Sequence, residues 1–163
     1  MREKKGVSAV VATVLLILIT LMAIGILWIF IKPMVEKNLE EGASCFELRD
    51  QAEIVQGDYT YYNNTVTSLV IKRGFKGGEI KGYRVSINFG ADSEAFDLIN
   101  NTVVSGNIEV TMSDGATTIA LPDSGEAKNY IFKKANGTQA DLGIITKSGN
   151  ICKMGSYDIP EQE

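Results

Sequence analysis

The chain of 163 residues contains no histidine, which excludes several common kinds of catalytic site. Without an imidazole there is no Ser-His-Asp triad, no Cys-His dyad and no histidine-ligated zinc. The two cysteines, Cys45 and Cys152, lie too far apart for a CxxC motif. The glycines at positions 74, 77 and 78 match neither the GxGxxG nor the Walker A spacing. We therefore expect a protein that is not an enzyme, with no catalytic residues, no cofactor and no metal.

Carboxylates are present, and a short run of them could still have a chemical role. Asp92, Glu94 and Asp97 lie close together in the sequence. Isolated acidic side chains in a loop are most often solvated surface, and this is the interpretation we favour. A catalytic dyad among them, or a calcium site that uses Asp92 and Glu94, is the alternative.

Charge is also absent from one long stretch, Val7 to Ile31. Twenty-five consecutive residues without a charge are typical of a membrane-spanning helix. As a helix they would be about 37 Å long, against a hydrocarbon core of about 30 Å. A secretory signal peptide has a shorter apolar stretch, roughly 7–15 residues, followed by a small-residue cleavage site. The stretch therefore predicts a helix that is retained in the mature protein.

The basic residues that flank this stretch indicate its orientation. Arg2, Lys4 and Lys5 precede it directly, so the positive-inside rule places the N-terminus in the cytoplasm. Lys32 and Lys37 follow it and oppose this assignment. The larger, C-terminal part of the chain is therefore expected outside the cell.

Residues 4–16 read KKGVSAVVATVLL, a basic pair and a glycine immediately before the apolar stretch. This segment resembles the class III signal and helix start of archaeal type IV pilins, and the resemblance extends over residues 1–33. It implies that residues 1–6 are a signal, that prepilin peptidase cleaves after Gly6, and that Val7 becomes the new N-terminus. The fifth residue of the mature helix would be Val11, where bacterial pilins usually have a glutamate. Archaeal pilins commonly lack this glutamate.

The same resemblance implies a function and a set of partners. The chain would be a structural subunit of a surface filament used for adhesion, a homopolymer of identical subunits built by an ATP-driven assembly machine. It would reside in the cell membrane before assembly and in an extracellular filament afterwards. Small residues on the helix would allow close approach of neighbouring helices: Ser8, Thr13, Thr20 and Gly25.

Nucleic acid is not an expected partner. Removal of residues 1–6 would take three basic residues and one acidic residue from the 16 and 20 of the whole chain, leaving a net charge of −6. Phosphate binding requires a basic surface instead.

Three other interpretations of the chain and its apolar stretch are open. The chain could be a membrane-anchored, pilin-like protein whose outer domain binds a solute or a surface without polymerising. It could be a lipoprotein, because a small-residue run precedes Cys45, although that site lacks a leucine three positions earlier and lies far beyond the apolar stretch. It could also be an archaellin, although the Gly-Val-Ser start fits adhesion pilins better.

Beyond Ile31 the predicted helix becomes amphipathic and is expected to end at Gly42, so that it spans residues 7–42. Pro33 removes the N–H that would bond to the carbonyl of Ile29, which favours a kink there. The alternative is that Pro33 ends the helix and that the chain is irregular from Met34 onward.

Residues 43–163 are expected to form a β-rich outer domain, which gives an α+β fold with an antiparallel β-sandwich. Alternation begins at Phe46 and Leu48, and the clearest strand runs from Ile80 to Phe89. Asn63-Asn64 and Gly77-Gly78 are predicted turns. Six to nine short strands separated by turn signals are typical of a sandwich.

We expect Cys45 and Cys152 to form a disulfide, because both lie in the segment placed outside the membrane and they are the only cysteines. Two unrelated buried thiols are the alternative. Three triplets fit the N-glycosylation pattern, with Asn63, Asn100 and Asn136 as the acceptors, each on a predicted turn.

Two further groups of residues have both a structural and a functional interpretation. Five basic residues gather across the Gly77-Gly78 turn: Lys72, Arg73, Lys76, Lys81 and Arg84. They fit a solvated hairpin with protected edges, or else a basic patch that meets an acidic face of a neighbouring subunit. The tyrosines at positions 59, 61 and 62 are expected to pack in strands, with surface adhesion as the alternative.

Overall fold

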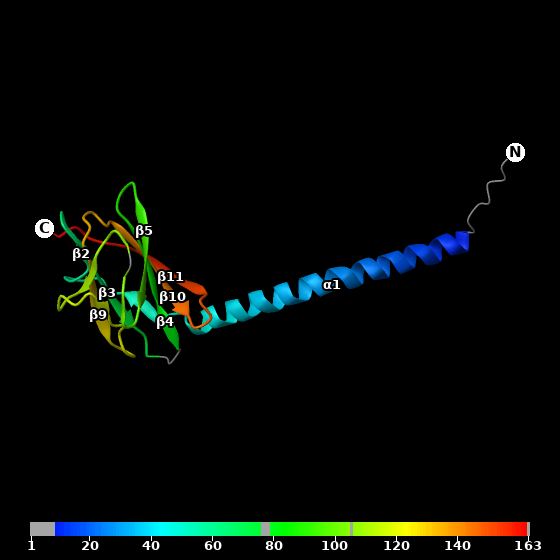
Figure 1. Cartoon of the computed structure of the whole chain (residues 1–163), viewed down its shortest axis with the longest axis horizontal. Helices are drawn as coiled ribbons and strands as arrows, with labels where there is room; N and C mark the ends of the chain where they lie inside the picture. The colour runs from blue at the N-terminus through cyan, green and yellow to red at the C-terminus, as the bar shows by residue number, and fades with distance from the viewer. Residues whose placement is uncertain (1–8, 76–78, 105, 163) are drawn as a thin grey trace. The chain divides into compact units, whose positions relative to one another are not determined.

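The fold is α+β: a long N-terminal helix is followed by a domain of antiparallel β-sheets (Figure 1). The computed structural model describes residues 9–75, 79–104 and 106–162. The chain divides after Ala43 into a helical unit and a β-domain of residues 44–163, and each is described here by itself.

Helix α1 runs from Ala9 to Glu47 without interruption. It continues through Pro33, which excludes a break at that residue, and it continues five residues beyond Gly42, the expected end. A single glycine inside a helix costs only about 1 kcal/mol relative to alanine, so it does not have to end one. A turn at residues 48–50 follows the helix, and Asp50 has a positive φ of 65°. Phe46, expected in a strand, therefore lies in the last turn of the helix.

Eleven strands are assigned in the described part of the β-domain, and they form two main sheets. The first sheet has the order β1-β3-β9-β7, with β2 also paired to β3, and the second has the order β11-β10-β4-β5. A short ladder of β6 and β8 completes the domain. The strands are β1 (Ala52–Ile54), β2 (Tyr61–Tyr62), β3 (Thr67–Arg73), β4 (Ile80–Asn88), β5 (Ser93–Ile99), β6 (Thr102–Val103), β7 (Val110–Met112), β8 (Thr118–Ile119), β9 (Ala127–Phe132), β10 (Gln139–Thr146) and β11 (Ile151–Asp158).

Strand β4 shows why these residues form a sheet. Its alternating residues Tyr83, Val85 and Ile87 are fully buried, while the residues between them are partly exposed. Side chains of a strand point alternately to its two faces, so this pattern fits one face against a core and one toward solvent. The strand predicted from Ile80 to Phe89 is confirmed apart from its last residue.

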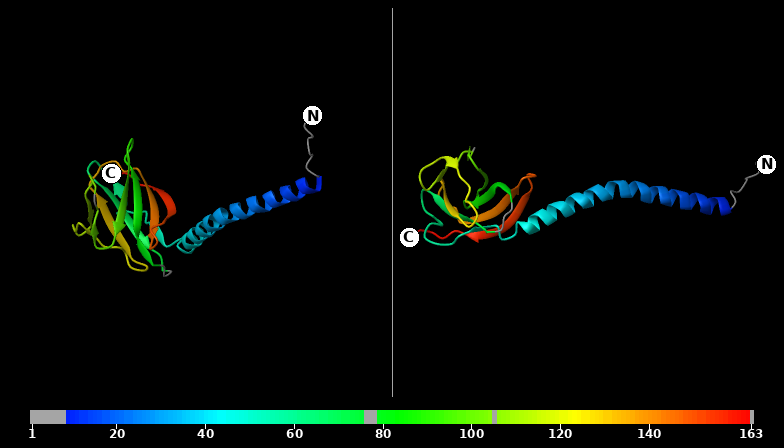
Figure 2. Two further views of the ribbon diagram at one scale, coloured as in Figure 1. Left: turned by 45° about the vertical axis from the view of Figure 1, so that its right-hand side comes forward. Right: turned by 90° about the horizontal axis from the view of Figure 1, so that it is seen from below.

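The core of the β-domain lies between its two main sheets, which face one another as two layers (Figure 2). The rings of Phe96 in β5 and Phe132 in β9 meet across the layers with their centroids 4.9 Å apart. Burying a large apolar side chain contributes roughly 1.5–3 kcal/mol, so this layer of side chains is the main source of stability. The predicted sandwich is confirmed.

The two predicted turns have different outcomes. Asn63 closes the hairpin of β2 and β3: its Oδ1 accepts hydrogen bonds from the N–H groups of Thr65 and Val66, both at 2.9 Å. Gly77 and Gly78 lie outside the described residues. The strands on either side of them, β3 and β4, belong to different sheets, so this connection is not a hairpin.

Candidate functional site

The most extensive candidate interaction surface is the helix itself. Residues Ala9–Leu39 of α1 form a 31-residue segment that is long and apolar enough to cross a membrane, and an 18-residue stretch within it has a mean hydropathy of 3.0. Its large apolar side chains are exposed all around the helix, including Leu18, Trp28 and Phe30. Exposed apolar surface of this extent has to be covered by lipid or by other protein.

The polar groups on this helix do not prevent burial in an apolar environment. The hydroxyls of Thr13 and Thr20 donate to the carbonyls of Val10 and Ile17, both at 2.9 Å. Each hydroxyl therefore has a partner within its own helix, as a helix in lipid requires. A Cβ atom added at Gly25 would meet nothing within 4 Å, so this glycine leaves an open notch in the helix surface.

The predicted cleavage site, Gly6 and Val7, lies outside the described residues, as does Ser8. Cleavage after Gly6 therefore stays a prediction. The charged side chains begin after the apolar stretch, where Lys32 and Glu36 form an exposed ion pair one helical turn apart, at 3.7 Å.

The predicted disulfide is present. Cys45 in the last turn of α1 and Cys152 in β11 are bonded, with their Cα atoms 5.2 Å apart. Cys152 is buried in the core, and in the ladder of β10 and β11 it lies opposite Ile144. The bond therefore attaches the start of the β-domain to β11, the edge strand of its second sheet.

The three glycosylation acceptors lie at the surface but differ in their contacts. The side chain of Asn63 is part of the β2–β3 turn, and its Nδ2 donates to Oε1 of Gln162 at 3.3 Å. Asn100 is exposed, and its Oδ1 accepts a hydrogen bond from the N–H of Leu121 at 3.1 Å. Asn136 is exposed on a turn, with a positive φ of 61°.

The predicted basic residues are divided between the two sheets. Lys72 in β3 pairs with Glu53 at 3.1 Å, and Arg84 in β4 makes two hydrogen bonds of 2.6 Å to the carboxylate of Asp97. The Arg84 guanidinium holds the pKa of Asp97 below its usual value, chiefly through these hydrogen bonds. Acidic partners thus offset part of the predicted positive patch. Lys76 lies outside the described residues.

In the acidic run around the start of β5, Glu94 forms an ion pair. The carboxylate of Glu94 pairs with Nζ of Lys134 at 2.7 Å, and the same Nζ lies 4.5 Å from the ring centroid of Phe89. Within the described residues there is no group of three or more acidic or cysteine side chains placed to hold a metal ion. Glu94 therefore serves an ion pair.

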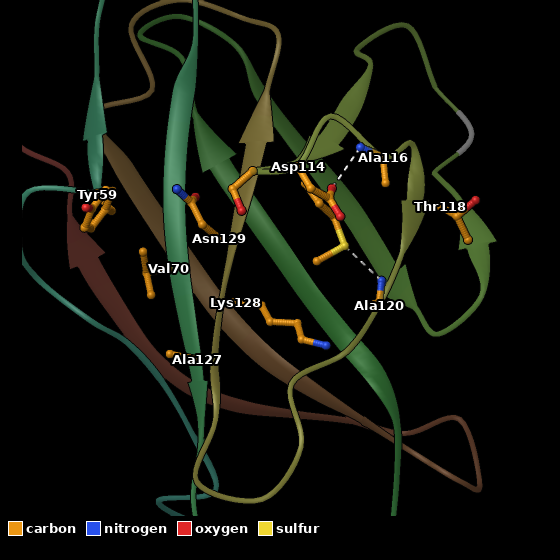
Figure 3. A pocket seen from close by; sticks show the side chains of 11 residues that line it. Tyr59, Val70, Asp114, Ala116, Thr118, Ala120, Ala127, Lys128 and Asn129 are labelled. Atoms are coloured by element: carbon orange, nitrogen blue, oxygen red, sulfur yellow. Dashed lines mark hydrogen bonds between the residues drawn. The ribbon is translucent and has the colours of Figure 1, made fainter.

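The predicted tyrosine cluster separates into strand and surface residues. Tyr61 and Tyr62 form β2, as expected. Tyr59 is 70% exposed and borders a groove of about 580 Å³ that passes over β9 (Figure 3). Val70, Asp114, Ala120, Lys128 and Asn129 also line the groove. Sequence reasoning missed it, because its residues come from four separate segments that only the tertiary structure brings together.

Hydrogen bonds hold the segment that carries Tyr59, which borders the groove. The Oγ of Ser68 lies 2.7 Å from the carbonyl oxygen of Tyr59 and 2.9 Å from Oδ1 of Asn129. The buried hydroxyl of Thr60 donates to the carbonyl of Val55 at 2.6 Å and accepts from the N–H of Val70 at 3.1 Å. The turn that presents Tyr59 is therefore held to β3 through the carbonyl of Tyr59 and the hydroxyl of Thr60.

Neither any protein-family model nor any curated protein matches the sequence of this chain.

Proposed function

We propose that the chain is a structural subunit of an archaeal type IV pilus-like surface filament, assembled through its N-terminal helix. The prepilin peptidase removes residues 1–6, and the mature helix holds the subunit in the membrane. Identical helices then leave the lipid and bury their apolar faces on one another. The β-domain remains outside the cell and forms the filament surface.

The observation that supports this proposal most directly is the exposure of the uncharged part of helix α1, residues 9–31. A helix that is apolar on all sides suits both environments that a pilin meets, first lipid and then a bundle of like helices. The disulfide adds support, because such bonds persist in oxidising compartments outside the cytoplasm. The start of the chain resembles archaeal pilins at the residues around Gly6, as described above.

Substitution of Leu18 by lysine tests the assembly step. A charge at a bilayer centre costs roughly 2.5–3.5 kcal/mol on insertion scales, and a packed apolar filament core should penalise it at least as much. We expect electron microscopy to show no filaments, alongside near-normal amounts of protein in the membrane fraction. Leu18→Ile is the matched control and should assemble. Normal filaments of Leu18→Lys would contradict the proposal.

A second variant separates assembly from anchoring without adding a charge. Gly25→Leu makes the helix more apolar and fills the open notch, so insertion into the membrane should be unaffected while close helix packing is blocked. Ala23→Leu is the matched control, since its side chain lies about 200° around the helix from residue 25. We expect a larger loss of filaments for Gly25→Leu than for Ala23→Leu. Equal assembly of the two would argue against a packing role for Gly25.

The second candidate function is a membrane-anchored binding protein that does not polymerise. The groove beside Tyr59 favours it, because a binding site in the outer domain needs no filament. Imaging of the cell surface, with an antibody to the β-domain, distinguishes the two functions. Labelled filaments support the subunit, whereas label confined to the membrane supports the anchored binding protein.

A further inference from the structure

We infer that the groove over β9 is a binding site for a neutral saccharide, with Tyr59 as its stacking platform. This inference goes beyond filament assembly, and it applies equally to a polymerised and to an anchored form of the chain. The site consists entirely of β-domain residues and includes none of the helix residues on which assembly depends.

The first argument is the way in which Tyr59 is held. An aromatic side chain with 70% of its surface exposed buries little apolar area, so it adds little to folding stability. Yet the turn beneath it is anchored by the hydroxyls of Ser68 and Thr60, both buried in the domain. The backbone that carries the ring is therefore already ordered before a ligand binds, and preorganisation of this kind raises affinity.

The second argument is the arrangement of polar groups along the groove. One end of the Asn129 amide is held by Oγ of Ser68 at 2.9 Å, and within the described residues no hydrogen bond engages its other end. The Oδ1 of Asp114 accepts the N–H of Ala116 at 2.9 Å, which orients the carboxylate and leaves Oδ2 as an acceptor. Nζ of Lys128 is 3.6 Å from Glu126, so its charge is largely balanced. The groove thus offers both donors and acceptors, together with the negative charge of Asp114.

The third argument is the shape and the lining of the groove. Its volume of about 580 Å³ falls within the roughly 300–1,000 Å³ of small-ligand sites. Its floor is mainly apolar, with the small side chains of Ala116, Ala120 and Ala127. Strand β7 pairs with β9 only up to Met112, so the groove is open along the edge of β9 (Figure 3). An open groove suits a chain-like ligand that continues into solvent.

These features together select the ligand class. A sugar ring has an apolar C–H face, which stacks on a tyrosine, and hydroxyls that both donate and accept hydrogen bonds. A lipid tail would leave the Asn129 and Asp114 groups without partners. A phosphorylated or acidic ligand would meet the Asp114 carboxylate and a mature chain of net charge −6. A neutral saccharide can stack on Tyr59 and form hydrogen bonds with Asn129 and Asp114, and it carries no charge that the Asp114 carboxylate would repel.

The test uses the full chain in detergent and an array of immobilised neutral oligosaccharides, including maltotriose, cellotriose and chitotriose, with sialylated and sulfated glycans and short peptides for comparison. We expect retention on at least one neutral glycan. Tyr59→Ala and Asn129→Ala should each weaken this binding about tenfold, which corresponds to roughly 1.4 kcal/mol. Tyr59→Phe keeps the ring and should bind within about threefold of the wild type, which corresponds to roughly 0.6 kcal/mol.

The matched control is Phe75→Ala, which truncates another exposed aromatic side chain that does not line the groove. It should bind as the wild type does. The inference is overturned if the wild type retains only acidic glycans, only peptides or nothing, or if Tyr59→Ala binds as well as Phe75→Ala. Thermal unfolding of every variant excludes misfolding, and filament formation by Tyr59→Ala reports separately on assembly.

Discussion

Cys45 and Cys152 are joined across 107 positions of the sequence, and the bond links the last turn of the helix to the strand β11. Since Cys152 is buried beside the core of the β-domain, the point at which the chain leaves α1 is fixed to the domain.

Reduction of this disulfide should destabilise the β-domain. In the chain-entropy model, a closed loop of about a hundred residues contributes up to roughly 4.7 kcal/mol. We expect the urea midpoint of the full chain, followed by near-ultraviolet circular dichroism in detergent, to fall on addition of a reductant. The double variant Cys45→Ala/Cys152→Ala should already have the lower midpoint and should not respond to the reductant. An unchanged wild-type midpoint would contradict the stabilising role.

The Arg84–Asp97 pair should make stability depend on pH in the acid range. Because the pKa of Asp97 is lowered in the folded state, the unfolded state binds more protons there. The contribution of the pair is therefore complete above the unfolded pKa of about 3.9, and it is lost as the pH falls through the lower folded-state pKa.

The variant Asp97→Asn tests the direction of this pH dependence of stability. The variant should be less stable than the wild type at neutral pH, and the difference in urea midpoint should shrink as the pH is lowered below about 4. Asp92→Asn, on the exposed turn before β5, is the control for removal of an acidic residue. A difference between Asp97→Asn and the wild type that grows on acidification would show that the sign is wrong.

Gly137→Ala should destabilise the β-domain. Gly137 is buried, and an added Cβ would lie 2.5 Å from Oγ1 of Thr67 and 2.9 Å from Cγ2 of Ile87. Overpacking of this kind costs about 1–3 kcal/mol in the free energy of unfolding. Gly106→Ala is the control, since its nearest neighbour atom would be 4.0 Å away. Equal urea midpoints for the two variants would count against the packing described here.

Glycan attachment is expected at Asn100 and Asn136 rather than at Asn63. The Asn63 amide is used at both ends, by the β2–β3 turn and by Gln162, and modification of Nδ2 would break the second contact. Glycopeptide mass spectrometry of the protein from its natural host measures the occupancy at each acceptor. Higher occupancy at Asn63 than at the other two would refute this order.

Cleavage between Gly6 and Val7 is expected from the basic residues and the glycine that precede the apolar stretch. Intact-mass measurement and N-terminal sequencing of the membrane-extracted protein should give a chain that starts at Val7. A mature chain that starts near Cys45 would support a lipoprotein instead and would remove the basis of the filament proposal.

The sequence alone determined the features that depend on local composition. The length and composition of an uncharged apolar run are enough to favour a helix in lipid, so the stretch from Val7 to Ile31 identified an apolar helix without knowledge of its surroundings. The period-two pattern from Ile80 to Phe89 likewise identified β4, because alternate burial is a property of one strand. The disulfide followed because the chain contains only two cysteines and both lie outside the apolar stretch.

Only the tertiary structure decided which segments meet. An alternating pattern does not specify its partner, so neighbouring strands β3 and β4 could not be assigned to separate sheets from their sequences, and Lys72 and Arg84 were grouped in one patch. The helix extends past Gly42 because a single glycine inside a helix costs only about 1 kcal/mol relative to alanine, which is too little to end it. The groove beside Tyr59 combines residues up to 70 positions apart, from Tyr59 to Asn129, and such proximity results from long-range pairing of β3 with β9.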